Sequence, residues 1–384
     1  MKKILKTFIL MIVLINIIII NCYAEESEVV KAKVIETKEI YEEQTDNMTE
    51  KIQKVEVEIL EGKRQGERFE AKYCLSYDID NKIVAYELNK GNTVIVQINE
   101  AQEDSETQVI VQDVIRQNYI LYMLLAFFLL IILVGRKQGL KAILALVITV
   151  ALIYMVMISS IYKGYNAILM SILTSFIIIV ITFIIISGFN KKSFTAAIGT
   201  IGGVAFAGIM AFLFGVLAKL SGGQEEAIML SISAQNMTFN FRELLFAGIV
   251  IASLGASMDV GMSIASSLDE IKQKDPNITG KELFKSGMNI GGDIIGTMTN
   301  TLILAYVGGA LNLILLFMAS NMNILDIINK ETIASEAISA IAGSMGVIFT
   351  VPTTAFVYAF INRHKTIYKK KSDNIINGQR SLKI

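Results

Sequence analysis

The chain has 384 residues, of which 53% are apolar and only 18% are charged, whereas soluble domains are closer to a quarter charged. Its 35 basic side chains are balanced by 35 acidic ones, so no basic surplus points to nucleic acid. With one histidine, His364, and two cysteines, Cys22 and Cys74, a His/Cys metal site is close to excluded, and no cofactor is expected.

Residues 1–24 have the layout of a secretory signal peptide. The cationic start MKKILK precedes an apolar run that is shorter than the ~20 residues of a spanning helix. Small residues at Cys22 and Ala24 offer a cleavage site after Ala24. An uncleaved membrane anchor is the alternative. Cleavage would leave Cys74 without a cysteine partner in the mature chain.

Residues 25–117 are polar and predict a small β domain. From Val55 to Ile59, apolar residues alternate with glutamates, which predicts a strand with one buried face. NTVIVQIN repeats the alternation, and the turn signals EGKRQG and NKG separate the runs. Five or six short strands suit a barrel of the OB or SH3 type, without a catalytic constellation. Three tyrosines of this domain could line a binding face: Tyr73, Tyr77 and Tyr86. The preferred interpretation is that they are core or half-buried strand residues.

Residues 118–361 are strongly apolar and predict seven membrane-spanning helices. Most of the apolar segments are long enough to cross a bilayer, and the first can be extended by its flanking residues. The segments are residues 119–134, 140–158, 167–186, 194–217, 244–266, 292–318 and 337–360. The fold class expected is therefore an α-helical multi-pass membrane protein with a small N-terminal β domain.

Basic residues predict the orientation of these helices. Lys and Arg are concentrated in the first, third and fifth connections and in the tail, residues 362–384. By the positive-inside rule these parts are cytoplasmic. The β domain is then extracytoplasmic, which is also where a signal peptide would deliver it.

Two predicted helices carry stripes of small residues. In residues 194–217, Gly or Ala recurs at every fourth position from Gly199 to Gly215, which predicts close helix packing. In residues 244–266, Asp259 shares one side with small residues three or four positions apart. Asp259 is therefore expected on a packed face rather than toward lipid.

A polar stripe occurs in GMNIGGDIIGTMTNT, residues 287–301. Spacings of three and four place its members on one helix face. They are Asn289, Asp293, Thr297 and Asn300. Asp259 and Asp293 lie on consecutive helices at broadly similar predicted depth, so they could meet. We therefore predict a polar intramembrane site, with the amide and hydroxyl groups as neutral ligands.

Two further signals concern the helices around this site. Pro276 is expected to stop the fifth helix, and TGKE is a capping-box pattern that predicts the start of a short amphipathic helix. Pro352 in the last helix lacks an N–H group and predicts a kink. Broken helices often line transporter sites, although many membrane prolines are structural. Pro352 is kept as a candidate site residue.

The stretches FRELLFAGIVIASLGASMDVGMSIASSLDEI and KELFKSGMNIGGDIIGTMTNTLILAYVGGALNLILL resemble the YibE/F-like family of bacterial membrane proteins. The likeness covers about residues 119–360, and the turn VGRKQGLKA and the β domain also fit. It implies a multi-pass protein of the bacterial plasma membrane, for which a permease role is the usual assumption. The family's motif residues fall on Asp259, Asn289, Asp293, Thr297 and Asn300.

Three function classes stay open. A permease or secondary transporter would use the aspartates to carry a proton or cation and would bind a small molecule or ion of unknown identity. An intramembrane aspartyl protease would need glycine where Ile290 stands, so no enzyme activity is expected. A non-catalytic sensor or assembly module acting through the β domain is the alternative, because Asp and Asn can also hold helices together. The lipid bilayer is an expected partner, and a homo-oligomer is left open.

Overall fold

The computed structural model describes residues 28–45, 48–75, 86–99, 107–223 and 239–380. The chain divides into two compact units, residues 1–130 and 131–384, and each is described by itself. The predicted signal peptide and Tyr77 lie outside the described residues.

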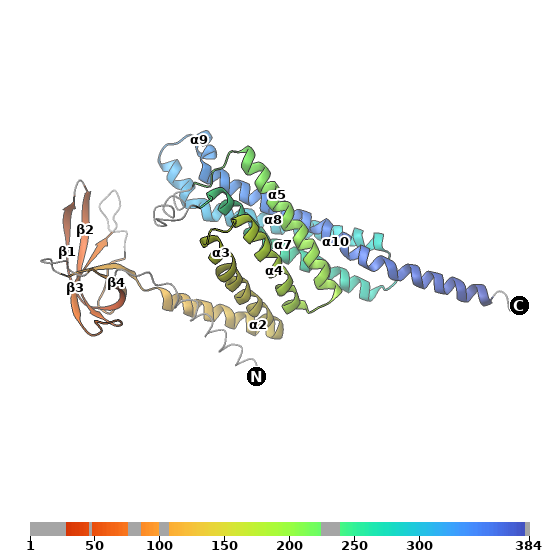
Figure 1. The fold of residues 1–384 in the computed structure, drawn as a ribbon, viewed down its shortest axis with the longest axis horizontal. Helices are drawn as coiled ribbons and strands as arrows, with labels where there is room; N and C mark the ends of the chain where they lie inside the picture. The colour runs from red at the N-terminus through yellow and green to blue at the C-terminus, as the bar shows by residue number, and fades with distance from the viewer. Residues whose placement is uncertain (1–27, 46–47, 76–85, 100–106, 224–238, 381–384) are drawn as a thin grey trace. The chain divides into compact units, whose positions relative to one another are not determined.

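The first unit contains a closed five-stranded barrel (Figure 1). The strands are β1 (Glu28–Thr45), β2 (Met48–Ile59), β3 (Arg68–Leu75), β4 (Thr93–Asn99) and β5 (Gln108–Val114). Their order around the barrel is β1-β2-β3-β5-β4, and β4 also pairs with β1. The β3–β5 pair is parallel and the other pairs are antiparallel. The predicted barrel is confirmed, and its order is that of the OB type.

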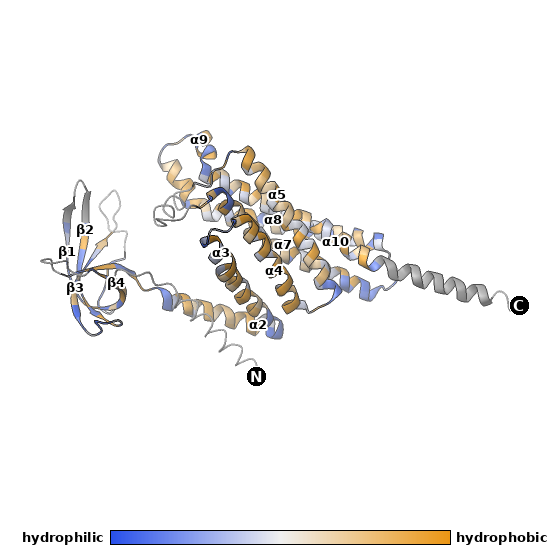
Figure 2. Ribbon diagram, viewed as in Figure 1, coloured by the Kyte–Doolittle hydropathy of each residue, from blue (hydrophilic) through white to orange (hydrophobic). Residues whose placement is uncertain are grey.

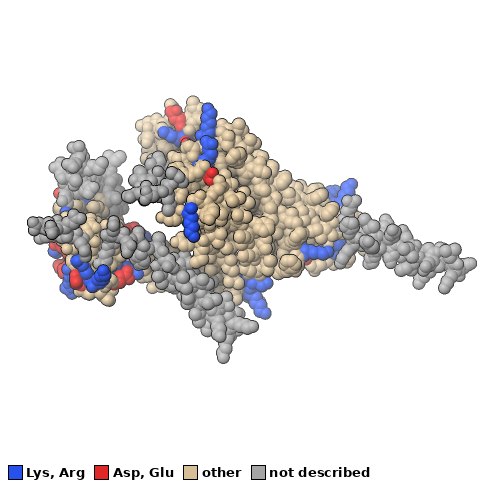
Figure 3. Space-filling view, viewed as in Figure 1, with Lys and Arg blue, Asp and Glu red and all other residues tan. Residues whose placement is uncertain are grey.

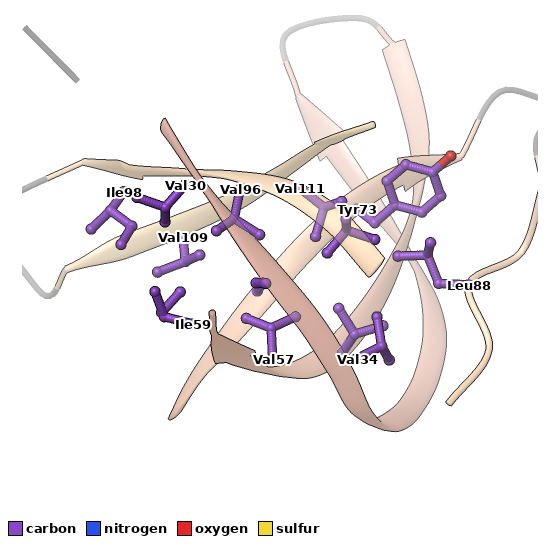
Figure 4. Packing of buried hydrophobic residues seen from close by; sticks show 14 of the residues in the cluster. Val30, Val34, Val57, Ile59, Tyr73, Leu88, Val96, Ile98, Val109 and Val111 are labelled. Carbon is purple, nitrogen blue, oxygen red and sulfur yellow. The ribbon is translucent and has the colours of Figure 1, made fainter. Parts of the chain in front are cut away.

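The alternating sequence pattern builds the core of this barrel. Every second residue of a strand points inward, and the inward positions from Val55 to Ile59 of β2 and from Val94 to Ile98 of β4 are buried valines and isoleucines. Tyr73 belongs to this core, with 8% of its surface exposed, whereas Tyr86 is exposed (Figure 4). The buried side chain of Gln53 donates to the carbonyl oxygen of Leu88 and accepts from its N–H group, both at 2.9 Å. This pair of hydrogen bonds fixes the segment before β4 against the barrel.

The remaining described elements are helical. They are α2 (Gln117–Leu152), the π-helix η1 (Ile153–Ile158), α3 (Ser159–Tyr162), α4 (Ala167–Ser187), α5 (Lys191–Leu217), α7 (Phe241–Lys274), α8 (Gly280–Ala319), α9 (Ile324–Asn329) and α10 (Glu331–Arg380). Six helical runs are long and apolar enough to cross a membrane (Figure 2). On the visible face of the helical unit, charged side chains lie near the ends and an uncharged surface lies between them (Figure 3).

The first two predicted spans belong to one helical run of 46 residues, Gln117–Tyr162. The run is broken at Arg136, whose backbone is non-helical at φ 49° and ψ −125°. A Cβ atom on Gly139 would meet the carbonyl oxygen of Ile131, although a straight helix separates these positions by about 12 Å. The chain therefore turns back sharply inside the sequence VGRKQG, so this run holds two apolar segments.

The small-residue stripe of α5 is buried along its whole length. It packs mainly on α10: a Cβ atom on Gly203 would lie 2.6 Å from the carbonyl oxygen of Gly346, and even closer to Oγ1 of Thr350. Ala207 and Gly346 meet at the next level, because a Cβ on Gly346 would lie 2.7 Å from that of Ala207. The predicted helix-packing role of the stripe is confirmed.

The helices α7 and α8 form a hairpin with a short connection. Pro276 follows the end of α7, and Thr279 caps α8 in a capping box with Glu282, as predicted. However, the capping box begins the whole 40-residue α8 rather than a separate short helix. The amphipathic first turns and the apolar span therefore form one continuous helix.

Candidate functional site

The polar stripe of α8 lies on one exposed face of that helix. All of its members, Asn289, Asp293, Thr297 and Asn300, are exposed. The opposite side contains the buried residues of α8, namely Leu283, Gly287 and Gly291. The structure thus brings the four predicted residues of α8 together, as the spacing requires.

Contacts of the glycines show which way this stripe faces. A Cβ atom on Gly287 would lie 2.7 Å from the Cβ atom of Ala355, and one on Gly291 would meet the side chain of Val351, so this side packs tightly on α10. Asp293 is turned by roughly 200° from Gly291 around the helix. At Gly292, beside Asp293, a Cβ atom would meet nothing within 4 Å. The polar stripe therefore points away from α10.

The stripe is not satisfied by the chain's own polar groups. Thr297 donates to the carbonyl oxygen of Ile294 at 3.0 Å, within its own helix. Among the residues that the structure describes, Asn289, Asp293 and Asn300 have no side-chain hydrogen bond and no ion pair. Groups of this kind need a partner or water inside a membrane.

Asp259 lies on an exposed face of α7, so its predicted place on a packed face is wrong. Ala252, Gly255 and Ser263 on that side are exposed as well, whereas Ala256, also predicted on this face, is partly buried and packs against the core. The packed stripe of α7 is a different set, buried at every fourth position: Ser253, Ser257, Gly261 and Ala265. A Cβ atom on Gly261 would lie 2.7 Å from Oγ1 of Thr200, and that hydroxyl donates to the carbonyl oxygen of Ser257 at 3.3 Å. This close approach to α5 fixes which side of α7 is buried.

No hydrogen bond or ion pair joins Asp259 to Asp293 among the described residues. Their depths along the hairpin are nevertheless similar. Leu268 of α7 is level with Gly287 of α8, because its Cδ1 atom would lie 3.1 Å from a Cβ on that glycine. From this level Asp293 is about 9 Å along α8 and Asp259 about 14 Å along α7. The two carboxylates thus differ by only about 5 Å in depth.

Pro352 is not part of the polar face. The helix α10 continues through it without interruption. Its neighbour Thr353 donates to the carbonyl oxygens of Phe349 at 2.8 Å and Gly199 at 3.3 Å, and the second of these bonds reaches α5. Thr353 thus satisfies backbone carbonyl groups near the proline, and the segment serves packing between α5 and α10.

One polar contact of the bundle has no signal in the sequence. The hydroxyl group of Tyr358, whose side chain is buried, donates to Oδ1 of Asp269 at 2.9 Å. Gln273 donates to the other carboxylate oxygen at 2.8 Å. The contact ties the end of α7 to α10. Neither residue belongs to a motif, and only the packing of the two helices brings them together.

Comparison with protein families identifies the chain. The model of the YibE/F-like protein family matches residues 123–364, and that of the YibE/F family N-terminal domain matches residues 23–114. The chain belongs to the YibE/F family. The first match includes the whole polar stripe of α8, and the second includes all five strands of the barrel. Comparison with curated proteins and with solved structures gives no match.

In this YibE/F-family chain, the polar stripe of α8 carries amide, hydroxyl and carboxyl groups, and Asp293 is its one ionisable residue. Among the described residues, no group of three or more His, Cys, Asp or Glu side chains could hold a metal ion. A ligand of the stripe would therefore meet one carboxylate, two amides and one hydroxyl of α8. Such groups suit a proton, a weakly held cation or a small polar molecule.

Proposed function

We propose that this protein is a permease or secondary transporter whose substrate path includes the polar face of α8. The observation that carries the proposal is the row of exposed polar side chains on a helix long enough to span the membrane, of which Asn289, Asp293 and Asn300 have no partner among the described residues. An aspartate within a spanning helix is costly, by up to about 2.5–3.5 kcal/mol at the helix centre on insertion scales, so its presence in α8 needs a compensating role. Binding of an ion or polar substrate is such a role.

In this proposal Asp293 is the coupling group. Its carboxylate takes up a proton or a cation, and Thr297 and Asn300 supply neutral ligands one and two turns further along α8. Asp259, at similar depth on α7, provides a second carboxylate on an exposed face. The distribution of basic residues supports a plasma-membrane orientation with the C-terminus inside and the barrel outside. No described feature of the barrel favours the alternative, a sensor.

Proton flux into liposomes tests the proposal. The full chain is reconstituted in vesicles that contain a pH-sensitive dye, and a pH gradient is imposed with Na⁺ or K⁺ on either side. We expect faster dye response than in empty vesicles, and loss of this response in Asp293→Asn. Glu270→Gln is the control, because Glu270 is an exposed carboxylate beyond the apolar part of α7. Equal flux in empty vesicles, or in wild type and Asp293→Asn, would contradict the proposal for these ions.

A further inference from the structure

Among the described membrane-spanning helices, α8 has the least covered surface. No residue in the most apolar stretch of α8 is buried, whereas half of the residues are buried in the corresponding stretches of α7 and α10. The other exposed spans present mainly apolar side chains, which lipid can cover. Among the spans that the structure describes, only α8 carries a carboxylate and two amides in a row on its uncovered surface. That surface requires a polar cover.

We propose that the cover is a second copy of this chain, packed α8 against α8. The idea that the second copy completes a transport site rests on the proposed function. The contact between the two copies does not, because it is argued from the exposure and spacing of α8 alone. The interface is defined by the exposed residues Asn289, Asp293, Thr297, Asn300, Leu304, Val307 and Leu311. We call this set the α8 seam.

The seam has the spacing of a helix-pairing surface. From Asp293 to Leu311 the intervals alternate between four and three residues, which is the heptad pattern of two helices that wind around each other. Its first half is polar, and its second half consists of Leu and Val side chains that are 47% to 59% exposed. Membrane bundles commonly pair in this left-handed way. A single polar residue such as Asn300 would then fix the register of the pair.

Room for a close partner exists beside the seam. Gly292 and Gly296 lie four residues apart, and a Cβ atom on either would meet nothing within 4 Å. Small residues at this spacing allow two helix backbones to approach closely in a bilayer. The glycines of the opposite side, Gly287 and Gly291, are already filled by α10. The two pairs of glycines therefore indicate two packing partners, one inside the chain and one outside it.

The chemistry of the seam favours an identical partner. Amide and hydroxyl groups both donate and accept, so Asn300 can pair with Asn300 of a second copy across a two-fold axis. Two copies inserted in the same direction run α8 parallel to α8, which places like residues at like depth. The Asp293 carboxyl groups of the two copies then lie at the same depth, on either side of the axis. The shared site thereby gains the second carboxylate that one copy of α8 lacks.

Cysteine cross-linking in native membranes tests the contact. The cysteines at positions 22 and 74 are replaced by serine, and Leu304→Cys is introduced into the apolar half of the seam. Ile172→Cys on α4 is the control, because Ile172 is 53% exposed and Leu304 59%. Oxidation is expected to convert most of the Leu304→Cys protein into a covalent dimer and to leave Ile172→Cys monomeric. Equal dimer formation by both variants, or none by Leu304→Cys, would overturn the proposal.

A mass measurement on the wild-type protein tests the same contact without relying on a cysteine variant that could misfold. The mass of the wild-type protein in lipid nanodiscs is expected to be that of two chains, and Asn300→Leu is expected to weaken the dimer roughly 3- to 10-fold. A monomeric wild type, or a cross-link of Leu304→Cys to a different protein, would show that the partner is not a second copy. A dimer without proton flux would contradict only the proposed function. Flux that depends on Asp293 in a monomer would contradict only this inference.

Discussion

The small-residue stripe of α5 and the polar stripe of α8 are both regular faces of membrane helices, but the chain covers only one of them. Gly203 of α5 approaches the backbone of α10 so closely that a single added carbon atom would clash with Gly346. Beside Asp293 of α8, the same carbon atom at Gly292 would meet open space. The periodicity of a face shows which residues share it, whereas what covers that face depends on the rest of the fold.

The largest expected effect comes from Gly203→Leu. The larger side chain has no space between α5 and α10, and the backbone of Gly346 cannot move aside as a flexible side chain could. We expect loss of folded protein, measured as monodisperse yield after extraction and as thermal unfolding. Gly292→Leu is the matched substitution on α8 and should leave the single chain folded while it prevents cross-linking at Leu304→Cys. Comparable yields of folded protein for Gly203→Leu and wild type would contradict the close packing assigned to the stripe of α5.

Changes in the aspartates should remove activity and leave folding largely intact. Asp259→Asn is expected to abolish pH-dependent flux as Asp293→Asn does, because an amide cannot take up and release a proton as a carboxyl group does. Folding should be kept, because an amide and a protonated acid are nearly isosteric. The double variant should be no worse than either single one if both side chains serve one site. Additive defects would instead mean that the exposed faces of α7 and α8 act separately. Flux in vesicles and thermal unfolding of the same preparations give the two readouts.

A smaller effect is expected from Tyr358→Phe. The change removes the hydrogen bond to Asp269, which keeps its contact with Gln273. The cost of one such bond is about 1 kcal/mol, so the midpoint of thermal unfolding should fall by a few degrees. Tyr162→Phe is the control, because Tyr162 is exposed on α3. An unchanged midpoint in Tyr358→Phe would show that the contact between α7 and α10 does not stabilise the bundle.

The smallest effect concerns the exterior of the barrel. Hydrogen bonds from Lys38 and Lys54, together with their charges, hold the pKa of the Glu70 carboxyl below its usual 4.5. Because the pKa of Glu70 is lower in the folded state, its contacts stabilise that state at pH values above the usual pKa of 4.5. This contribution is lost as the pH falls through the folded-state pKa. The three side chains are all at least partly exposed to solvent, so the loss of stability should be slight.

Hydrogen exchange of the β2–β3 amides in wild type and Glu70→Gln would measure this effect. At neutral pH, exchange should be slightly slower in wild type, and the difference should vanish in acid. A difference that grows with acidity would contradict the assigned direction of the pKa shift.

Much of the fold follows from local patterns. Strict alternation from Val55 to Ile59 predicts the inner face of β2, and the four-residue repeat predicts the packed side of α5. TGKE marks the first turn of α8, because a capping box depends only on residues three positions apart. These signals are confirmed because each is a property of a single element.

The parts that could not be predicted depend on contacts between elements. Two sets of small residues interleave on α7, and only the close approach of Gly261 to α5 decides that the other set, with Asp259, stays exposed. The contact of Tyr358 with Asp269 likewise arises from two helices that are distant in the sequence. At the candidate site, spacing predicted the common face of Asn289 to Asn300, but not its direction away from α10.

The most direct test of the account asks whether the polar face of α8 meets water inside the membrane. In a background with serine at positions 22 and 74, Thr297→Cys is exposed to a membrane-impermeant thiol reagent that reacts with the ionised thiol. A hydrated polar path predicts rapid labelling of Thr297→Cys and none of Ile172→Cys, because a thiol ionises in water but not in lipid. Labelling of Thr297→Cys as slow as that of Ile172→Cys would place the stripe in a dry environment and contradict a transport site on α8.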